Sequence, residues 1–168
     1  MKSIPPGHDS VSFLLTQIGT HAAKRFAERL APLKLAPPHA GILRILNQAE
    51  SQSQRQLAAA LRMHASRLVA LIDELETLGL VARQSNGADR RTYTLRITEK
   101  GREAWAAIGR VGREQNNAIC GALNGDEREQ LAQLLQRIAG EQGLLRGVHP
   151  GYSQLGKPAK TTAPKARR

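Results

Sequence analysis

The chain has 168 residues, of which 25 are Lys or Arg and 14 are Asp or Glu, and its formal net charge is +11. A charge excess of this size favours polyanionic partners such as nucleic acid. The single cysteine excludes an intrachain disulfide and a cysteine-rich zinc site, and no apolar run approaches the roughly 18 residues of a membrane span.

The first eight residues contain two prolines and a glycine and should form a loose lead-in. They contain no apolar signal segment, so we expect a cytoplasmic protein with no membrane partner. Asp9 or Ser10 can cap a first helix, in which apolar residues recur at helical spacing as far as Leu30. Prolines then interrupt the pattern, and a second helix is expected from Pro38.

Residues 54 to 101 have the pattern of two short helices followed by a hairpin. A capping box at Ser53 to Gln56 opens the first helix, QRQLAAAL. The second, HASRLVALIDELETLGL, has one apolar face and ends at Gly79, a usual helix-ending residue. The connection between the two helices contains no glycine, and a left-handed Arg62 there would cost roughly 1 to 2 kcal/mol.

Two strands, LVARQ and TYTLRI, are expected after the second helix. Tyr93, Leu95 and Ile97 alternate with polar residues, which is the period of a half-buried strand. The segment between the strands, SNGADRR, has the composition of a polar loop with an Asn-Gly turn signal. Two helices followed by such a hairpin form the layout of a winged helix-turn-helix.

After the hairpin, Thr98 can cap a long helix and Asn124 a last one. The last helix has an apolar stripe at helical spacing: Leu131, Leu134, Leu135 and Ile138. This stripe and that of the first helix fit either a second chain or a monomeric core. Residues 146–168 contain six Lys or Arg and no acid, which leaves +5 for residues 1–145, and their Pro-, Ala- and Lys-rich composition predicts a disordered basic tail.

The segments LAAALRMHASRLVALIDELETLGLVAR and GADRRTYTLRITEKG resemble the DNA-binding lobe of the multiple-antibiotic-resistance regulator (MarR) family. The hairpin is the most specific part of the match. Asp89 and Arg91 stand at the family's D-x-R positions, and Thr98 to Gly101 follow its L-T-x-x-G pattern, with Ile97 in place of the usual Leu.

A weaker resemblance extends from about residue 11 to about residue 139. It implies a mainly α fold with a small β-hairpin wing, in which residues 9–145 form one domain. Within that domain, a winged helix-turn-helix over residues 38–98 lies between dimerisation helices over residues 9–35 and 99–145. Residues 1–8 and 146–168 lie outside it.

The start of the second helix of the pair is the expected DNA-recognition element, because a helix fits the major groove and its N-terminal residues approach base edges. The exposed candidates there are His64, Ala65, Ser66, Arg67 and Ala70. Ser66 could bond a phosphate or a base, Arg67 a guanine, and either alanine a thymine methyl. The alternative is an ordinary amphipathic surface helix.

The hairpin offers Arg90 and Arg91, and narrow minor grooves attract arginine. The resemblance implies that Asp89 positions Arg91 in or beside the minor groove; the alternative is a solvated turn. The first helix of the pair begins with free backbone N–H groups, which can bind a phosphate of the DNA backbone. The residues at this helix start are Ser53, Gln54 and Arg55.

In the resembling family, a cleft separates the dimer core from the winged lobe, and the resemblance implies that two histidines here lie near helices that border it, each with an arginine close by in the sequence. The side chains that could bind a small aromatic or anionic effector there are His21, Arg25, His39 and Arg44. The alternative is that they are ordinary solvated or helix-end side chains. The histidines lack metal-binding spacing and no enzyme motif is present, so we expect no metal, no cofactor and no catalysis. Cys120 is interpreted as a buried inert thiol rather than a redox switch.

The sequence therefore predicts a DNA-binding transcription regulator that binds a pseudo-palindromic double-stranded operator as a homodimer. Repression is the commoner mode in the resembling family, with possible release by a small-molecule effector. The main alternative is a largely sequence-independent nucleic-acid-binding or architectural protein driven by the basic tail. A small-molecule-binding protein that has lost DNA binding is a third possibility, and the retained Arg67 and Arg91 argue against it.

Overall fold

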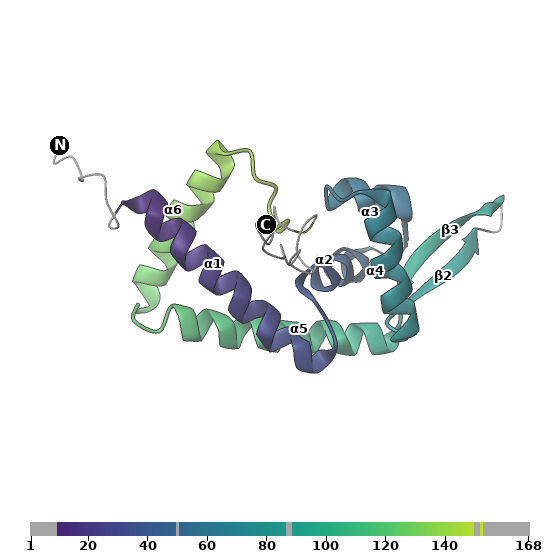
Figure 1. The fold of residues 1–168 in the computed structure, drawn as a ribbon, viewed down its shortest axis with the longest axis horizontal. Helices are drawn as coiled ribbons and strands as arrows, with labels where there is room; N and C mark the ends of the chain where they lie inside the picture. The colour runs from purple at the N-terminus through teal and green to yellow at the C-terminus, as the bar shows by residue number, and fades with distance from the viewer. Residues whose placement is uncertain (1–9, 50, 87–88, 150–151, 153–168) are drawn as a thin grey trace, which may run out of the picture.

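The computed structural model describes residues 10–49, 51–86, 89–149 and 152, and of residues 86 and 89–92 the backbone alone. In chain order the elements are α1 (Val11–Leu30), the short 3-10 helix η1 (Ala31–Leu33), α2 (Pro37–Gln48), β1 (Gln52–Ser53), α3 (Gln54–Ala60), α4 (Ala65–Thr77), β2 (Val81–Asn86), β3 (Asp89–Ile97), α5 (Glu99–Ile119) and α6 (Gly125–Glu141). Figure 1 shows α5 along the base, between an end formed by α1 and α6 and an end formed by α3, α4 and the hairpin. The mainly helical winged helix-turn-helix fold is confirmed.

Side-chain caps open the helices where the sequence predicts them. The Ser10 hydroxyl accepts the Phe13 N–H at 3.2 Å, and the Thr98 hydroxyl accepts the Gly101 N–H at 3.0 Å. Capping boxes open α3 at Ser53 and α6 at Asn124. Each such cap typically contributes about 1 kcal/mol, because it satisfies an N–H group that has no partner within the helix.

The connection between α3 and α4 contains a residue in the left-handed conformation, at the position where the sequence allows one in spite of its cost. Arg62 has φ 49°, and the Met63 N–H donates to the Ala58 carbonyl at 2.9 Å. At the other end of α4, Gly79 has φ 72° and ends the helix as expected. The turn is therefore sharp without a glycine, and α3 and α4 pack against each other directly after it.

The hairpin belongs to a three-stranded antiparallel sheet in the order β1-β3-β2. The two-residue strand β1 is too short to give a sequence pattern, and it pairs Gln52 with Leu95. β2 and β3 also extend into the segment predicted as a loop, since the backbones of Asn86 and Asp89 are paired. Only two residues, 87 and 88, separate the strands.

The alternation expected in β3 holds only at its base. Leu95 and Ile97 are buried, but Tyr93 is 52% exposed. Figure 1 shows the reason: beyond the lobe, the hairpin projects away from the helices, so its outer part has no layer to pack against. The prediction that Tyr93 lies on the buried face of the strand with Leu95 and Ile97 was therefore wrong.

One apolar core holds the winged lobe together. Its fully buried side chains come from α2, α3, α4 and β3, and include Leu43, Leu57, Leu68, Ile72 and Leu95. Ile108 of α5 and Leu30 at the end of α1 continue this core toward the other half of the molecule. The lobe and the long helices are therefore joined by packing as well as by the chain.

The T-x-x-G run joins the end of α4 to the start of α5. A Cβ on Gly101 would lie 2.1 Å from the Leu80 carbonyl oxygen, so only glycine fits there. The Thr98 hydroxyl donates to the Gly79 carbonyl at 2.7 Å, and Lys100 Nζ donates to the Leu78 carbonyl at 2.8 Å. These contacts give this part of the hairpin signature a structural role.

α1 and α6 expose the apolar stripes that the sequence predicts. On α1, Val11 and Ile18 are 55% and 53% exposed, and on α6 Leu134 and Ile138 are 45% and 41% exposed. α1 packs on α5 through its other side, where Gln115 Nε2 donates to the Ala22 carbonyl at 2.6 Å. Within the described ranges, no helix is both long and apolar enough to span a bilayer.

The chain after α6 returns to the winged lobe. The sequence assigns residues 146–168 to a disordered tail, but residues 146–149 and Tyr152 are described, and Tyr152 packs against the core. Composition does not reveal this return, because one aromatic ring among prolines, glycines and lysines leaves no periodic pattern.

Candidate nucleic-acid interface

α4 buries one face and exposes the other, as its sequence predicts. Leu68, Leu71, Ile72 and Leu75 are buried in the lobe. At the N-terminal end, the exposed side chains are small or polar: His64, Ala65, Ser66 and Ala70. His64 is the N-cap residue, without a side-chain capping bond, so its imidazole lies at the tip of the helix.

Val69 lies on the same exposed face, and the sequence reasoning missed it. Its side chain is 39% exposed, one turn after Ala65 and Ser66 on the helix surface. An apolar residue there is read as core when only composition is considered. Its position, three residues after Ser66 and four after Ala65, indicates that it shares their exposed face of the helix. A valine on a groove-facing surface can contact a thymine methyl group, as an alanine can.

Arg67 is half-buried rather than fully exposed. It shares a cavity of about 170 Å³ with residues of α2 and α4, among them Pro38, His39 and Glu74. Its backbone N–H donates to the His64 carbonyl at 3.1 Å, within the first turn of the helix. Arg67 therefore lies between the exposed face of α4 and the α2 side of the lobe.

Arg83 of β2 binds the acids in the second half of α4. Its Nη2 lies 2.6 Å from Asp73 Oδ1, its Nη1 pairs with Glu76, and its backbone N–H donates to Glu76 Oε1 at 3.1 Å. The hairpin is thereby attached to α4, and the charges of two acids are offset by a guanidinium.

His39 connects α2 to α4. Its side chain is 4% exposed; its Nδ1 accepts the Ala36 N–H at 3.0 Å, so the proton of the neutral ring is on Nε2. Nε2 lies 3.0 Å from Glu74 Oε2 but is poorly aligned for a hydrogen bond, so this contact is mainly electrostatic. Burial lowers the pKa of His39, and the nearby Glu74 carboxylate offsets part of that effect.

The four candidate effector residues are not gathered at one point. His21 and Arg25 are exposed on α1, and Arg25 pairs with Glu28 at 3.6 Å. His39 is buried in the lobe, and Arg44 lies against Gly147 of the chain after α6. Among the described residues, no hydrogen bond or ion pair joins the α1 pair to the α2 pair.

The start of α3 is largely occupied by its own cap. The Ser53 hydroxyl accepts the Gln56 N–H at 3.2 Å, and the Ser53 N–H donates to Gln56 Oε1 at 3.0 Å. Gln54 is half-buried and Arg55 is exposed. Of the three predicted phosphate contacts at this helix, Arg55 is the one whose side chain is open to solvent.

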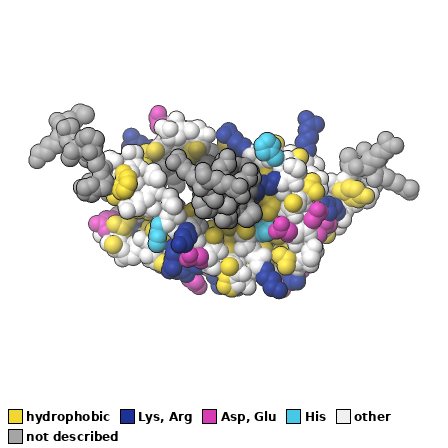
Figure 2. All heavy atoms as spheres, in the orientation of Figure 1, with side chains coloured by type: hydrophobic (Ala, Val, Ile, Leu, Met, Phe, Trp, Pro, Cys, Tyr) yellow, Lys and Arg dark blue, Asp and Glu magenta, His cyan; other side chains and the backbone are white. Residues whose placement is uncertain are grey.

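The side chains of Asp89, Arg90 and Arg91 lie outside the described part of the structure; their backbone forms the first residues of β3. Figure 2 shows Lys and Arg side chains spread over both halves of the visible face, with Asp and Glu among them. Cys120 is half-buried, with its sulfur 3.9 Å from Asn116 Oδ1. Across the described ranges, no three His, Cys, Asp or Glu side chains are placed to hold a metal ion.

The comparisons with known proteins agree with this geometry. A MarR family model matches residues 33–92, which cover α2, α3, α4 and most of the hairpin. A mutant MarR from E. coli complexed with operator DNA shares the fold, with 22% sequence identity, a TM-score of 0.64, and 76% of this chain and 92% of that chain covered.

Two structures of the transcriptional repressor CouR are also similar. The form bound to a 23-mer DNA duplex has 26% identity and a TM-score of 0.69, covering 82% of this chain and 99% of that chain. The form from Rhodococcus jostii bound to p-coumaroyl-CoA has 28% identity and a TM-score of 0.63, covering 78% of this chain and 92% of that chain. The winged lobe of the chain thus matches the MarR family of transcription regulators, and the chain shares the fold of the MarR and CouR structures along most of its length.

Proposed function

We propose that the protein binds a pseudo-palindromic DNA operator as a homodimer and regulates transcription from it, with repression as the expected mode. On the strength of this likeness it is a DNA-binding regulator and not an enzyme. The observation that carries the proposal is the charge arrangement on α4. Its N-terminal half exposes Ala65, Ser66, Val69 and Ala70 and no acid, whereas Asp73 and Glu76 are bound by Arg83.

This arrangement suits a helix in the major groove. Small side chains allow close approach, a serine can bond a base or phosphate, and apolar side chains can contact thymine methyl groups. Arg67 is the proposed guanine contact, and the exposed His64 and Arg55 are proposed phosphate contacts. In the hairpin, Arg91 and Arg90 are proposed for the minor groove, with Asp89 positioning Arg91.

The exposed stripes of α1 and α6 support the homodimer. Among the side chains that the structure describes, fourteen large apolar ones are more than about a third exposed in the single chain, and nine of these lie on α1 and α6. Burying them against a second copy would form the dimer. The half-sites read by its two α4 helices should then lie about one turn of DNA apart, roughly 34 to 36 Å.

The proposal also includes release of the protein from DNA when a small-molecule effector binds. CouR in the form bound to p-coumaroyl-CoA shows that a relative of this fold takes an anionic aromatic ligand. In this chain, His21 and Arg25 are exposed on α1, where Arg25 pairs with Glu28, whereas His39 lies against Glu74 and Arg44 lies against Gly147. An effector that used the latter pair would have to replace those contacts, and it would act through its different affinities for two lobe arrangements.

The test is fluorescence anisotropy with the duplex upstream of the protein's own gene and a scrambled duplex of equal length, each at two salt concentrations. A specific regulator should prefer the native duplex at both concentrations, since base contacts are less sensitive to salt than phosphate contacts. Equal affinities that weaken together with salt would contradict sequence-specific binding at that site.

The alternative, sequence-independent binding through the basic tail, is favoured by one observation: residues 146–168 contain six Lys or Arg and no acid. A chain that stops after Tyr152 loses five of these charges and keeps the described contacts with the lobe. Loss of all DNA binding in this shortened chain would favour the alternative, whereas a retained preference for the native duplex would favour the specific regulator.

A further inference from the structure

The segment that follows α6 is built as a series of turns; we call residues 142–149 and Tyr152 the C-terminal strap. The Leu144 N–H donates to the Ala139 carbonyl at 2.9 Å and thereby closes the end of α6. Further along, the Val148 N–H donates to the Leu145 carbonyl at 3.1 Å. In Figure 1 the strap leaves α6 and crosses to the α2 side of the winged lobe.

Tyr152 anchors the strap on α2. Its ring packs against the core of the lobe, and a Cβ placed on Gly41 would lie 2.8 Å from its Cε2 and 3.2 Å from its Cζ. The ring therefore lies directly on the backbone of α2, where any larger residue at position 41 would displace it. The Tyr152 N–H also donates to the His149 carbonyl at 3.0 Å, and the two rings are 5.6 Å apart.

Arg44 provides a second contact, three residues after Gly41 and so on the same face of α2. A Cβ on Gly147, whose φ is 73°, would lie 3.0 Å from the Arg44 Cζ and Nη1. Burial raises the pKa of the Tyr152 phenol, and the charge of Arg44 offsets part of that effect. Both effects agree with a tyrosine that is held in the lobe beside this arginine.

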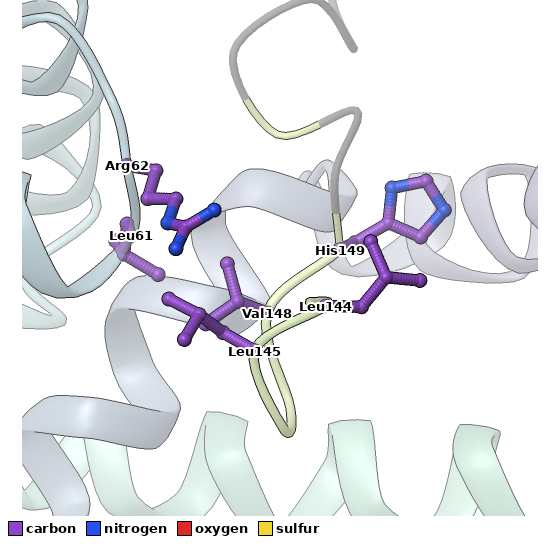
Figure 3. Close-up of a pocket in the computed structure, with 6 residues that line it drawn as sticks. All are labelled: Leu61, Arg62, Leu144, Leu145, Val148 and His149. Carbon is purple, nitrogen blue, oxygen red and sulfur yellow. The ribbon is translucent and has the colours of Figure 1, made fainter. Parts of the chain in front are cut away.

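The strap also faces the helix-turn-helix connection. Leu145 and Val148 lie opposite Leu61 and Arg62 across a cavity of about 150 Å³. Figure 3 shows the Arg62 guanidinium turned toward the part of the strap that carries Val148. Arg62 is the left-handed residue in the turn that leads from α3 into α4. The strap thus reaches both α2 and the turn that orients the recognition helix.

We propose that the C-terminal strap holds the winged lobe in a fixed orientation to the dimerisation helices, with Tyr152 on Gly41 as the positioning contact for DNA binding. The inference rests on the proposed function. α5 enters the lobe at Gly101, and the strap adds an attachment at Gly41 on α2. A lobe held at both points keeps little freedom to turn. Two lobes that already have the orientation needed for two half-sites lose less conformational entropy when DNA binds. The affinity for DNA is therefore higher.

The test uses four full-length variants: Tyr152→Ala, Gly41→Ala, the two combined, and Tyr152→Phe as the control that keeps the ring. Attachment of the strap to the lobe is measured by mass spectrometry, as the rate of tryptic cleavage after Arg146, which lies within the strap. DNA binding is read by anisotropy with the duplex upstream of the protein's own gene. Thermal melting identifies any variant that is unfolded at the assay temperature.

Tyr152→Ala and Gly41→Ala should each accelerate cleavage after Arg146 and weaken duplex binding, by about fivefold or more if the coupling has a usual size. Tyr152→Phe should match the parent. Adding Gly41→Ala to Tyr152→Ala should cause no further loss, because the ring with which the methyl group clashes is gone.

Faster cleavage with unchanged duplex affinity would overturn the inference, as would losses that simply add in the double variant. If Tyr152→Ala does not fold, Gly41→Ala tests the same contact from the other side without changing the strap. A parent chain that shows no preference for the native duplex would instead count against the proposed function.

Discussion

Arg83 and Asp73 form a contact of 2.6 Å between the first strand of the hairpin and the middle of α4. Arg83 also pairs with Glu76 one turn away, so one guanidinium holds two carboxylates of the proposed recognition helix. This side chain therefore adds polar contacts to the apolar packing that places the hairpin against α4.

Replacing Arg83 by Met should remove the polar contacts between the hairpin and α4 while keeping an apolar side chain of similar length. Because Asp73 is 57% exposed, we expect the free energy of unfolding to fall by only about 1 kcal/mol or less. Operator affinity should fall about fivefold or more, since wing and helix must then be aligned on the DNA. Urea unfolding and anisotropy measure the two effects.

Arg83→Lys is the informative control, because an ammonium group cannot hold both carboxylates in the way a planar guanidinium does. It should give an intermediate loss of affinity. A lysine variant equal to the parent, beside a weakened methionine variant, would mean that charge alone matters at this position.

Arg91→Ala should weaken operator binding roughly tenfold, about 1.4 kcal/mol, with little change in melting temperature. The reason is the proposed minor-groove contact at the tip of the hairpin. Arg102→Ala removes the same charge from an exposed site on α5 and serves as the matched control. Equal affinity of the Arg91 variant and the parent would remove the wing from the DNA-binding surface.

Leu135→Asp should dissociate the proposed homodimer, because it places a charge in the apolar stripe of α6. Leu135 is 38% exposed in the single chain, so the monomer has little reason to unfold. Sedimentation velocity should show the mass of one chain. Gln133→Asp, on the same helix but outside the stripe, should sediment as the parent; a Leu135 variant that does so too would place the interface elsewhere.

The stability of the lobe should decrease in mild acid because of His39. The pKa of its imidazole lies below the ordinary 6.5, chiefly because burial disfavours the charged ring. As the pH falls through about 6.5 the unfolded chain takes up a proton, whereas the folded chain does so only near its lower pKa. The free energy of unfolding should therefore fall between these two pH values and change no further, for this group, outside them.

His39→Gln should reduce this dependence, and urea unfolding between pH 7.5 and pH 5 measures it. His21→Gln is the matched control, since His21 is exposed on α1. If both variants follow the parent curve, the acid sensitivity of the protein arises from other groups.

What the sequence predicts well in this protein is local. The caps at Ser53, Thr98 and Asn124 and the helix end at Gly79 each depend on residues within one turn, so their patterns are visible in the chain. The apolar stripe of α4 is equally local, and it placed Leu68, Ile72 and Leu75 in the core correctly.

What the sequence could not predict depends on distant partners. Gly41 and Tyr152 are more than a hundred residues apart, and nothing near either one indicates the other. The same is true of β1, whose two residues form a strand only because β3 lies beside them. The exposure of Tyr93 depends on how far the hairpin extends beyond the helices, which its own alternation does not encode.

The close approach of Gly101 to the Leu80 carbonyl has a mechanical consequence. Together with the Thr98 and Lys100 hydrogen bonds to the carbonyls that follow α4, this close contact fixes the position of α4 relative to α5. A tilt of α5 in the dimer would therefore be transmitted to α4 as a rigid lever, with the largest displacement at the end farthest from the joint. That end is the one that carries Ala65 and Ser66.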